Sequence, residues 1–136
     1  MSAPAPVRPR ILTTPFILAW LVNLLHGLSF FMFIHLPRFL TELGADEVVI
    51  GLIVAASALA SIAIRPAVGT AMDRSGRRPA ILVGGMLNAI SVPLYFTVGS
   101  VGPWLVAVRI LHGLSAALLF TSISTYGADQ VPEERR

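Results

Sequence analysis

Four polar side chains lie inside long apolar runs of this sequence, where a polar group costs free energy and so needs a reason. Asn23 and His26 are three residues apart in one run, and Arg109 and His112 are three residues apart in another. Residues at this spacing share one face of a helix. Because histidine can titrate near neutral pH, these residues could form a polar site that couples to protons. The alternative is hydrogen bonding that only holds neighbouring helices together, worth ~0.6 kcal/mol on average.

The predicted depth of these residues is consistent with a shared site and does not exclude the alternative. Counted inward from Pro15 and Pro103 at about 1.5 Å per residue, His26 and His112 both reach ~14–17 Å, near the middle of a ~30 Å hydrocarbon core. Arg109 lies about six residues, or ~9 Å, into its helix. An arginine that faces lipid there costs ~2–3 kcal/mol, a cost that it avoids either by snorkelling to the outer headgroups or by facing a polar cavity. No acidic residue lies in the core of an apolar run, so the usual carboxylate proton carrier is absent from these runs.

The elements that must position these residues are membrane-spanning helices. Of the 136 residues, 55% are hydrophobic and only 12% are charged, whereas a soluble domain has roughly 25% charged residues. The chain is therefore predicted to be an all-α membrane protein with a helical domain over residues 15–128, a tail over 1–14 and a loop over 129–136. A cleaved signal peptide is the alternative for the first run, but no small-residue cleavage site follows it. The four predicted spans lie near 15–37, 48–72, 79–98 and 103–127.

Some local features of these helices are also predicted. Pro15 suits a first helical turn, with Thr13 or Thr14 as the N-cap. The stretch "PRFLTELGADE" after the first run is expected to be a short polar loop, and "GSVGP" separates the third span from the fourth. In the second span, small residues at four-residue spacing, such as Ser57 and Ser61, favour close contact between helix backbones.

The orientation in the membrane follows from arginine, which supplies all ten basic residues. Seven arginines lie in the two ends of the chain and in the connection between the second and third spans, and we expect Arg65 to snorkel to the same face. The opposite face has only Arg38. Because arginine accumulates on the cytoplasmic side, both termini are predicted to be cytoplasmic in a multi-pass protein of the plasma membrane, the inner membrane in a bacterial cell. The seven are Arg8, Arg10, Arg74, Arg77, Arg78, Arg135 and Arg136.

The connection "AVGTAMDRSGRRPAIL" concentrates four charged residues between two apolar runs. On charge alone it predicts a tight cytoplasmic turn that fixes the topology and touches anionic headgroups, with Gly76 permitting the turn. The spacing of its glycines and charged residues indicates more than the charge does. Gly69-x-x-x-Asp73-Arg74-x-Gly76-Arg77-Arg78 closely resembles the loop between the second and third helices of major facilitator superfamily transporters.

Two further stretches carry the same resemblance. "RILHGLSAA", which begins at Arg109, is similar to the fourth-helix pattern of the family, with His112 where the family often has glutamine and Ser115 where it often has glycine. "ADQVPEERR" is similar to the connection after the fourth helix in efflux-type members. The resemblance implies twelve spans in two six-helix halves that alternate access around a midplane site. It also implies that the first and fourth helices line the central pathway, so we expect Arg109 to face a polar cavity. The chain would then be an N-terminal portion of four helices, apparently truncated, whose partners are the remaining C-terminal helices.

The resemblance also implies a conformational latch at the charged connection. Asp73 would lie close to a helix terminus of the opposite half and help to hold the outward-facing state, a contact worth roughly 0.3–1 kcal/mol. Gly69 would let that helix approach. Arg77 would pair with Asp129, although Asp129 could instead be a solvated loop acid. The residues of the predicted latch are Gly69, Asp73, Arg74, Gly76, Arg77, Arg78 and Asp129.

The sequence as a whole predicts transport of a small molecule across the lipid bilayer by alternating access, with proton-coupled efflux as the expected form. The substrate or proton pathway is assigned to Asn23, His26, Arg109 and His112. The alternatives are a truncated or non-transporting membrane protein, such as an assembly subunit, and a dimeric four-helix multidrug exporter, which would need a first-helix glutamate that this chain lacks. No nucleotide-binding loop, metal-ligand cluster or activated nucleophile is present in the sequence, so we expect no enzyme activity and no cofactor. The arginines are scattered between apolar runs, which argues against a nucleic-acid partner.

Overall fold

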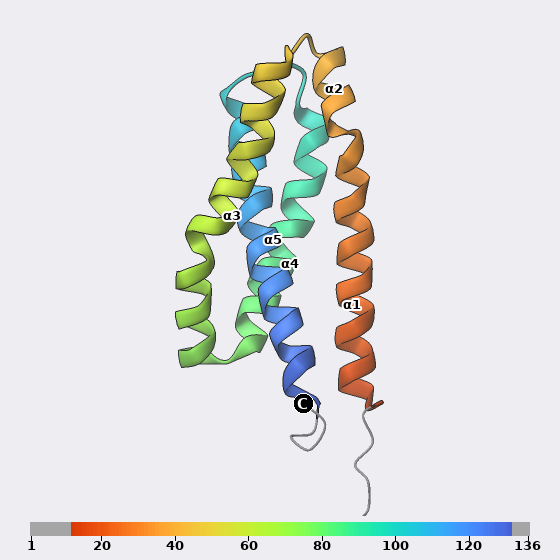
Figure 1. Cartoon of the computed structure of the whole chain (residues 1–136), viewed down its shortest axis with the longest axis vertical. Helices are drawn as coiled ribbons and strands as arrows, with labels where there is room; N and C mark the ends of the chain where they lie inside the picture. The colour runs from red at the N-terminus through yellow and green to blue at the C-terminus, as the bar shows by residue number, and fades with distance from the viewer. Residues whose placement is uncertain (1–11, 132–136) are drawn as a thin grey trace, which may run out of the picture.

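The computed structural model describes residues 12–131, and these residues form an all-helical bundle without a β-strand (Figure 1). Four helical segments are long and apolar enough to cross a membrane, which confirms the predicted fold class. They are Thr14–Glu42, Glu47–Ser75, Arg77–Thr97 and Pro103–Asp129. Most of the predicted tail and terminal loop, with Arg8, Arg10, Arg135 and Arg136, lies outside the described residues.

The elements follow one another along the chain with very short connections. In order they are α1 (Thr14–Phe31), the 3-10 turn η1 (Met32–His35), α2 (Leu36–Glu42), α3 (Glu47–Ser75), α4 (Arg77–Leu94), the 3-10 turn η2 (Tyr95–Thr97) and α5 (Pro103–Asp129).

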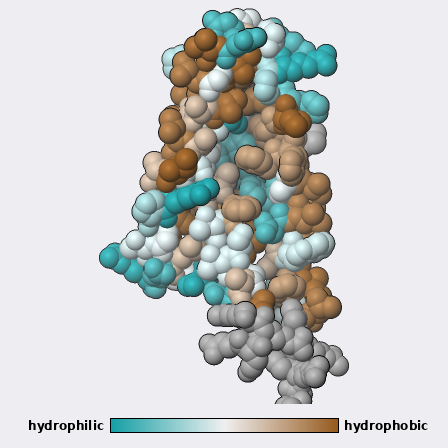
Figure 2. Space-filling view, viewed as in Figure 1, coloured by the Kyte–Doolittle hydropathy of each residue, from teal (hydrophilic) through white to brown (hydrophobic). Residues whose placement is uncertain are grey.

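Helix α5 forms the centre of the bundle. It packs against α3 and α4 along most of its length and also contacts α1. Within the most apolar 18 residues of each span, half of those in α5 are buried inside the bundle, whereas at most 17% are buried in each of the other three spans. Most apolar side chains of those spans point outward, and Figure 2 shows apolar surface along the sides of the molecule. Such a surface suits contact with lipid tails on the outside and helix packing on the inside.

The first connection is shorter than the sequence predicted. The stretch "PRFLTELGADE" was expected to be a polar loop, but its first part continues the first span through η1 into α2. Only residues 43–46 lie outside a helix. The loop then ends at Asp46, whose side chain accepts a hydrogen bond of 2.8 Å from the Val49 backbone N–H and caps α3. Thr13 caps α1 in the same way, by accepting from the Phe16 backbone N–H at 3.4 Å.

The charged connection between α3 and α4 is a one-residue turn rather than a loop. Asp73 and Arg74 belong to the last turn of α3, and Arg77 and Arg78 begin α4. Gly76 alone joins the two helices, with a φ of 80°, and its N–H donates to the Met72 carbonyl at 2.9 Å. A residue with a Cβ is strained at this φ, so glycine is required for the turn.

Two glycines let the neighbouring helices approach α5 closely. A Cβ added to Gly84 of α4 would lie 2.8 Å from the Cβ of Leu118 and 2.9 Å from the backbone N of Leu119. A Cβ added to Gly113 of α5 would overlap the backbone carbonyl of Ser57 on α3. Since lipid gives helices no hydrophobic drive to associate, this contact between backbones supplies van der Waals packing that holds the bundle together.

Adjacent glycines on α4 provide a matched test of this packing. We expect Gly84→Ala to destabilise the bundle by about 1–3 kcal/mol, because α4 must move away from α5. Gly85→Ala is the control, because a Cβ there has nothing within 4 Å. The measurement is the free energy of unfolding in detergent micelles, followed by circular dichroism. Equal effects of the two substitutions would show that the close approach at Gly84 does not stabilise the bundle.

Candidate functional site

Arg109 lies inside the bundle and is held by groups from two other elements. Its side chain is 6% exposed. Nε donates to the Ile53 carbonyl at 3.4 Å, Nη1 donates to the Tyr95 hydroxyl at 3.2 Å and Nη2 donates to the Ser57 hydroxyl at 2.5 Å. All three acceptors are uncharged. The guanidinium is therefore fixed in direction, while no carboxylate among residues 12–131 neutralises its charge.

His112 lies one helical turn from Arg109 and shares its tyrosine partner. The residue is 3% exposed, and its Nδ1 is 3.2 Å from the Tyr95 hydroxyl. Because that hydroxyl accepts from Arg109, it satisfies both neighbours when it donates its own proton to Nδ1, which then belongs to a neutral ring protonated at Nε2. The ring also lies against α1 and η1, with its centroid 6.5 Å from that of Phe30 and 4.3 Å from that of Phe33.

Tyr95 is a site residue that the sequence reasoning missed. Helix α4 ends just after Pro93, and the chain tightens into η2, which turns the Tyr95 side chain toward α5. A tyrosine near a span end is usually an interfacial anchor, so its type alone gave no reason to select it. Depth could have identified it, because Tyr95 and Arg109 lie at similar distances from the short connection between their helices.

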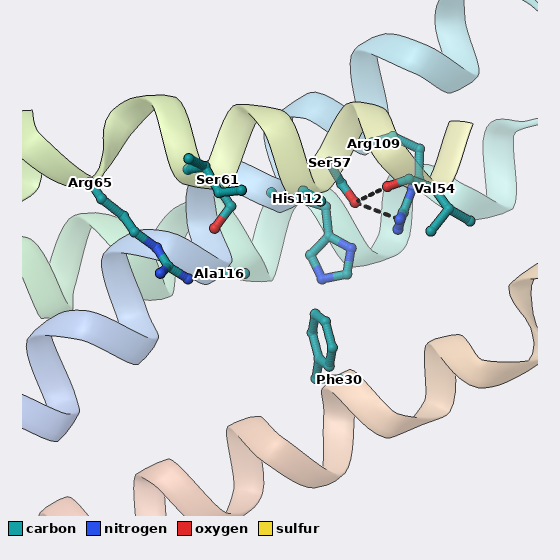
Figure 3. Close-up of a pocket in the computed structure, with 11 residues that line it drawn as sticks. Phe30, Val54, Ser57, Ser61, Arg65, Arg109, His112 and Ala116 are labelled. Atoms are coloured by element: carbon teal, nitrogen blue, oxygen red, sulfur yellow. Dashed lines mark hydrogen bonds between the residues drawn. The ribbon is translucent and has the colours of Figure 1, made fainter. Parts of the chain in front are cut away.

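Three of the four predicted pathway residues line two adjoining hollows between α1, α3 and α5. The first, of about 320 Å³, is lined by Arg109 and His112, and the second, of about 310 Å³, by His26. Phe30 and Arg65 line both hollows. Figure 3 shows Phe30 projecting from α1 toward the His112 ring, across the hollow from α3. In the space-filling view, polar surface is recessed between apolar side chains on this face (Figure 2).

Asn23 and Arg65 have different surroundings from those of Arg109 and His112. Asn23 lines a third hollow, which shares Gly27, Phe31 and Phe120 with the second one. Arg65 does not extend along α3 toward the end that holds Asp73. Its side chain reaches across toward α5 near Ala116 instead (Figure 3). The structure thus places His26, Arg109 and His112 on two hollows with shared walls, adds Arg65 to both, and places Asn23 on the third.

The residues of the predicted latch gather at the end of the bundle where α3 meets α4. Arg77 Nε lies 2.9 Å from Asp129 Oδ2, which joins the start of α4 to the end of α5. No acceptor among the described residues is aligned with the Nε–H, so this contact is electrostatic rather than a directed hydrogen bond. Gly69 is half-buried on α3. Asp73, Arg74 and Arg78 are exposed. No group of three or more possible metal ligands occurs within residues 12–131.

Comparison with known proteins gives the chain a family. A family model described as Major Facilitator Superfamily matches residues 19–136. The chain is 33% identical over 101 residues to the quinolone resistance protein NorA of Staphylococcus aureus. The aligned residues make up 74% of this chain and 26% of that protein. The chain is also 30% identical over 93 residues to multidrug resistance protein 1 of Bacillus subtilis. Here the aligned residues make up 68% of this chain and 24% of that protein. The chain thus spans about a quarter of the length of these relatives. No solved structure gives a significant match.

The tyrosine between Arg109 and His112 can be tested by removing one oxygen atom. We expect Tyr95→Phe to cost about 1–3 kcal/mol of stability, because a buried guanidinium N–H and His112 Nδ1 both lose their partner. Tyr126→Phe is the matched control, since the Tyr126 hydroxyl has no hydrogen bond to a described residue. Thermal unfolding of both variants in detergent measures the effect. If the two variants unfold together with the wild type, Tyr95 does not hold the site.

Proposed function

We propose that this chain, which belongs to the major facilitator superfamily, forms four membrane-spanning helices of a transporter that exports small molecules. The observation that carries the proposal is the buried Arg109 on the wall of a hollow large enough for a solute. A charged side chain inside the hydrocarbon region is expensive, so it marks a substrate or ion pathway. The relatives are named for resistance to quinolones and to multiple drugs, which favours export of drug-like compounds as the activity of the whole protein.

The proposed mechanism is alternating access around the hollow beside Arg109 and His112. In this mechanism the solute enters from the cytoplasmic side, and a change of conformation then closes that side and opens the other. Helix α1 covers one side of the hollow, and α3 with α5 forms the opposite wall. His26 and His112 are the candidates for proton exchange, since the described spans hold no acidic residue in their cores.

The proposed latch lies at one end of the same bundle. Asp73 at the last turn of α3 is exposed and therefore available to a helix terminus outside the described residues. A carboxylate at a helix N-terminus gains roughly 0.3–1 kcal/mol. The ion pair between Arg77 and Asp129 ties α4 to α5 beside it. A bias of ~1 kcal/mol from such contacts changes the ratio of two conformations several-fold, which is enough to affect a transport rate.

We expect cells that express the protein from its natural gene to accumulate less of a fluorescent quinolone than cells without it. The neutralising substitution Asp73→Asn should slow this export several-fold at an unchanged level of protein in the membrane, because the latch loses its carboxylate. Glu42→Gln is the control. It removes an exposed carboxylate at the other end of the bundle, where Glu42 pairs with Arg38.

Each result has a separate meaning. Full export by the Asp73→Asn protein would remove the latch and leave the transporter in place. Equal accumulation with and without the wild-type protein, over quinolones, cationic dyes and neutral dyes alike, would contradict export. The protein would then be a membrane protein without transport activity.

The proposed orientation places both termini of the chain and the turn at Gly76 in the cytoplasm. The chain contains no cysteine, so single cysteines can be introduced at Ser75 and at Ser100, which are exposed at opposite ends of the bundle. We expect a membrane-impermeant maleimide to label Ser100→Cys in intact cells and Ser75→Cys only in inverted membrane vesicles. The reverse pattern would place the charged turn outside the cell.

A further inference from the structure

We infer that the hollow beside Arg109 binds an organic anion, namely a molecule with an apolar body and one carboxylate or sulfonate group. The inference rests on the proposed function, because this anion is the compound that the transporter exports. Four observations support it: the charge of the walls, the unused hydrogen-bond donors of Arg109, the position of the Arg65 side chain and the apolar lining of the hollows.

The walls of the two adjoining hollows carry basic groups and no acidic ones. Arg65 and Arg109 line the first hollow together with His112, and His26 lines the second. No acidic residue of the described chain lines either hollow. Those acidic residues all lie at helix ends or in connections, and they are Glu42, Asp46, Glu47, Asp73 and Asp129. The positive charge of this space therefore has no counter-charge within residues 12–131, and a cation entering it would be repelled.

The hydrogen bonds of Arg109 leave capacity for an anion. A guanidinium has five N–H donors, and the described residues accept one bond from each of its three nitrogen atoms. Nη1 and Nη2 each keep a second N–H. The three neutral acceptors set the direction of the group without neutralising it. A carboxylate or sulfonate can accept charge-assisted hydrogen bonds from such N–H groups, which are about twice as strong as those between neutral groups.

Arg65 adds a second positive charge from the opposite wall. Its side chain extends from α3 across the space toward Ala116 on α5 (Figure 3). Pro66 follows it inside α3, and the side chain lines both hollows rather than one. Since it is exposed and has no ion pair with a described residue, it can move to meet a bound anion.

The remaining walls suit an apolar body. Phe30, Phe31 and Phe120 line the second hollow, and Val54 and Ile62 line the first. The hollows measure about 320 and 310 Å³ and share part of their walls. Sites for drug-sized ligands typically start at ~300 Å³ and are mostly apolar with a few polar groups that fix orientation. A ligand fits these walls if its aromatic ring packs against the phenylalanines and its acidic group binds the arginines.

A pair of fluorescent probes separates charge from shape. Anilinonaphthalenesulfonate and phenylnaphthylamine share one aromatic skeleton, and only the first carries a sulfonate. The protein is expressed at its natural length and reconstituted in nanodiscs of phosphatidylcholine, so that no anionic lipid competes for the arginines. Saturable binding is measured for wild type, Arg65→Gln, Arg65→Lys and Arg109→Gln. Arg38→Gln, which removes an exposed arginine outside the hollows, is the control.

We expect the wild type to bind the sulfonate probe more tightly than the neutral probe. Arg65→Gln should weaken the sulfonate probe by about tenfold, the loss of one charge-assisted hydrogen bond, and leave the neutral probe unchanged. Arg65→Lys should recover most of the affinity, because the charge returns. Arg109→Gln should act like Arg65→Gln if it folds, and Arg65→Gln decides the result alone if it does not.

Two results would overturn the inference. One is equal affinity for the two probes, which would mean that a carboxylate from outside the described residues neutralises the arginines. The other is an equal loss for Arg65→Gln and Arg38→Gln, which would mean that the sulfonate binds a general positive surface. Both are independent of the export assay. A transporter that exports cationic dyes but not anionic compounds would keep the proposed function and lose this inference.

Discussion

The buried charge of Arg109 is the constraint on which the arrangement of these helices depends. A guanidinium inside hydrocarbon is stable only where hydrogen-bond acceptors surround it. The acceptors come from two directions: Ser57 and the Ile53 carbonyl from α3, and the Tyr95 hydroxyl from η2. Helix α5, which carries the arginine, must therefore lie between α3 and α4. It does lie there, and it is the most buried of the four spans.

The close packing of α5 on α3 and the hydrogen bond between Arg109 and Ser57 both depend on Gly113. Gly113 is four residues after Arg109, so both lie on the face of α5 that meets α3. The missing side chain of Gly113 lets the Ser57 backbone approach, and that approach brings the Ser57 hydroxyl to Arg109. A larger residue at Gly113 would separate the helices and remove an acceptor from the buried charge. The glycine therefore contributes to the site without touching the hollow through a side chain.

Most of the fold could be predicted from the sequence, because apolar length and helix-capping residues are local signals. The four spans, the cap at Thr13 and the break at "GSVGP" follow from such signals. The prediction of a polar loop over "PRFLTELGADE" was wrong in its first part. Whether this stretch continues a helix depends on contacts between helices that no local pattern records. Tyr95 was missed for the same reason, since its partners lie on α5.

The described helices are not held equally firmly. Helix α5 is tied to α4 twice, near Tyr95 at one end and by Arg77 with Asp129 at the other, and it is tied to α3 through Ser57. Helix α1 packs mainly against α5, and Ala19 is its one buried residue among those described. Few buried contacts mean a low local free energy of opening. Arg109 and His112 therefore lie in the most closely packed part of the described helices, whereas Phe30 on the other side of the hollow lies on the helix that has the fewest buried contacts.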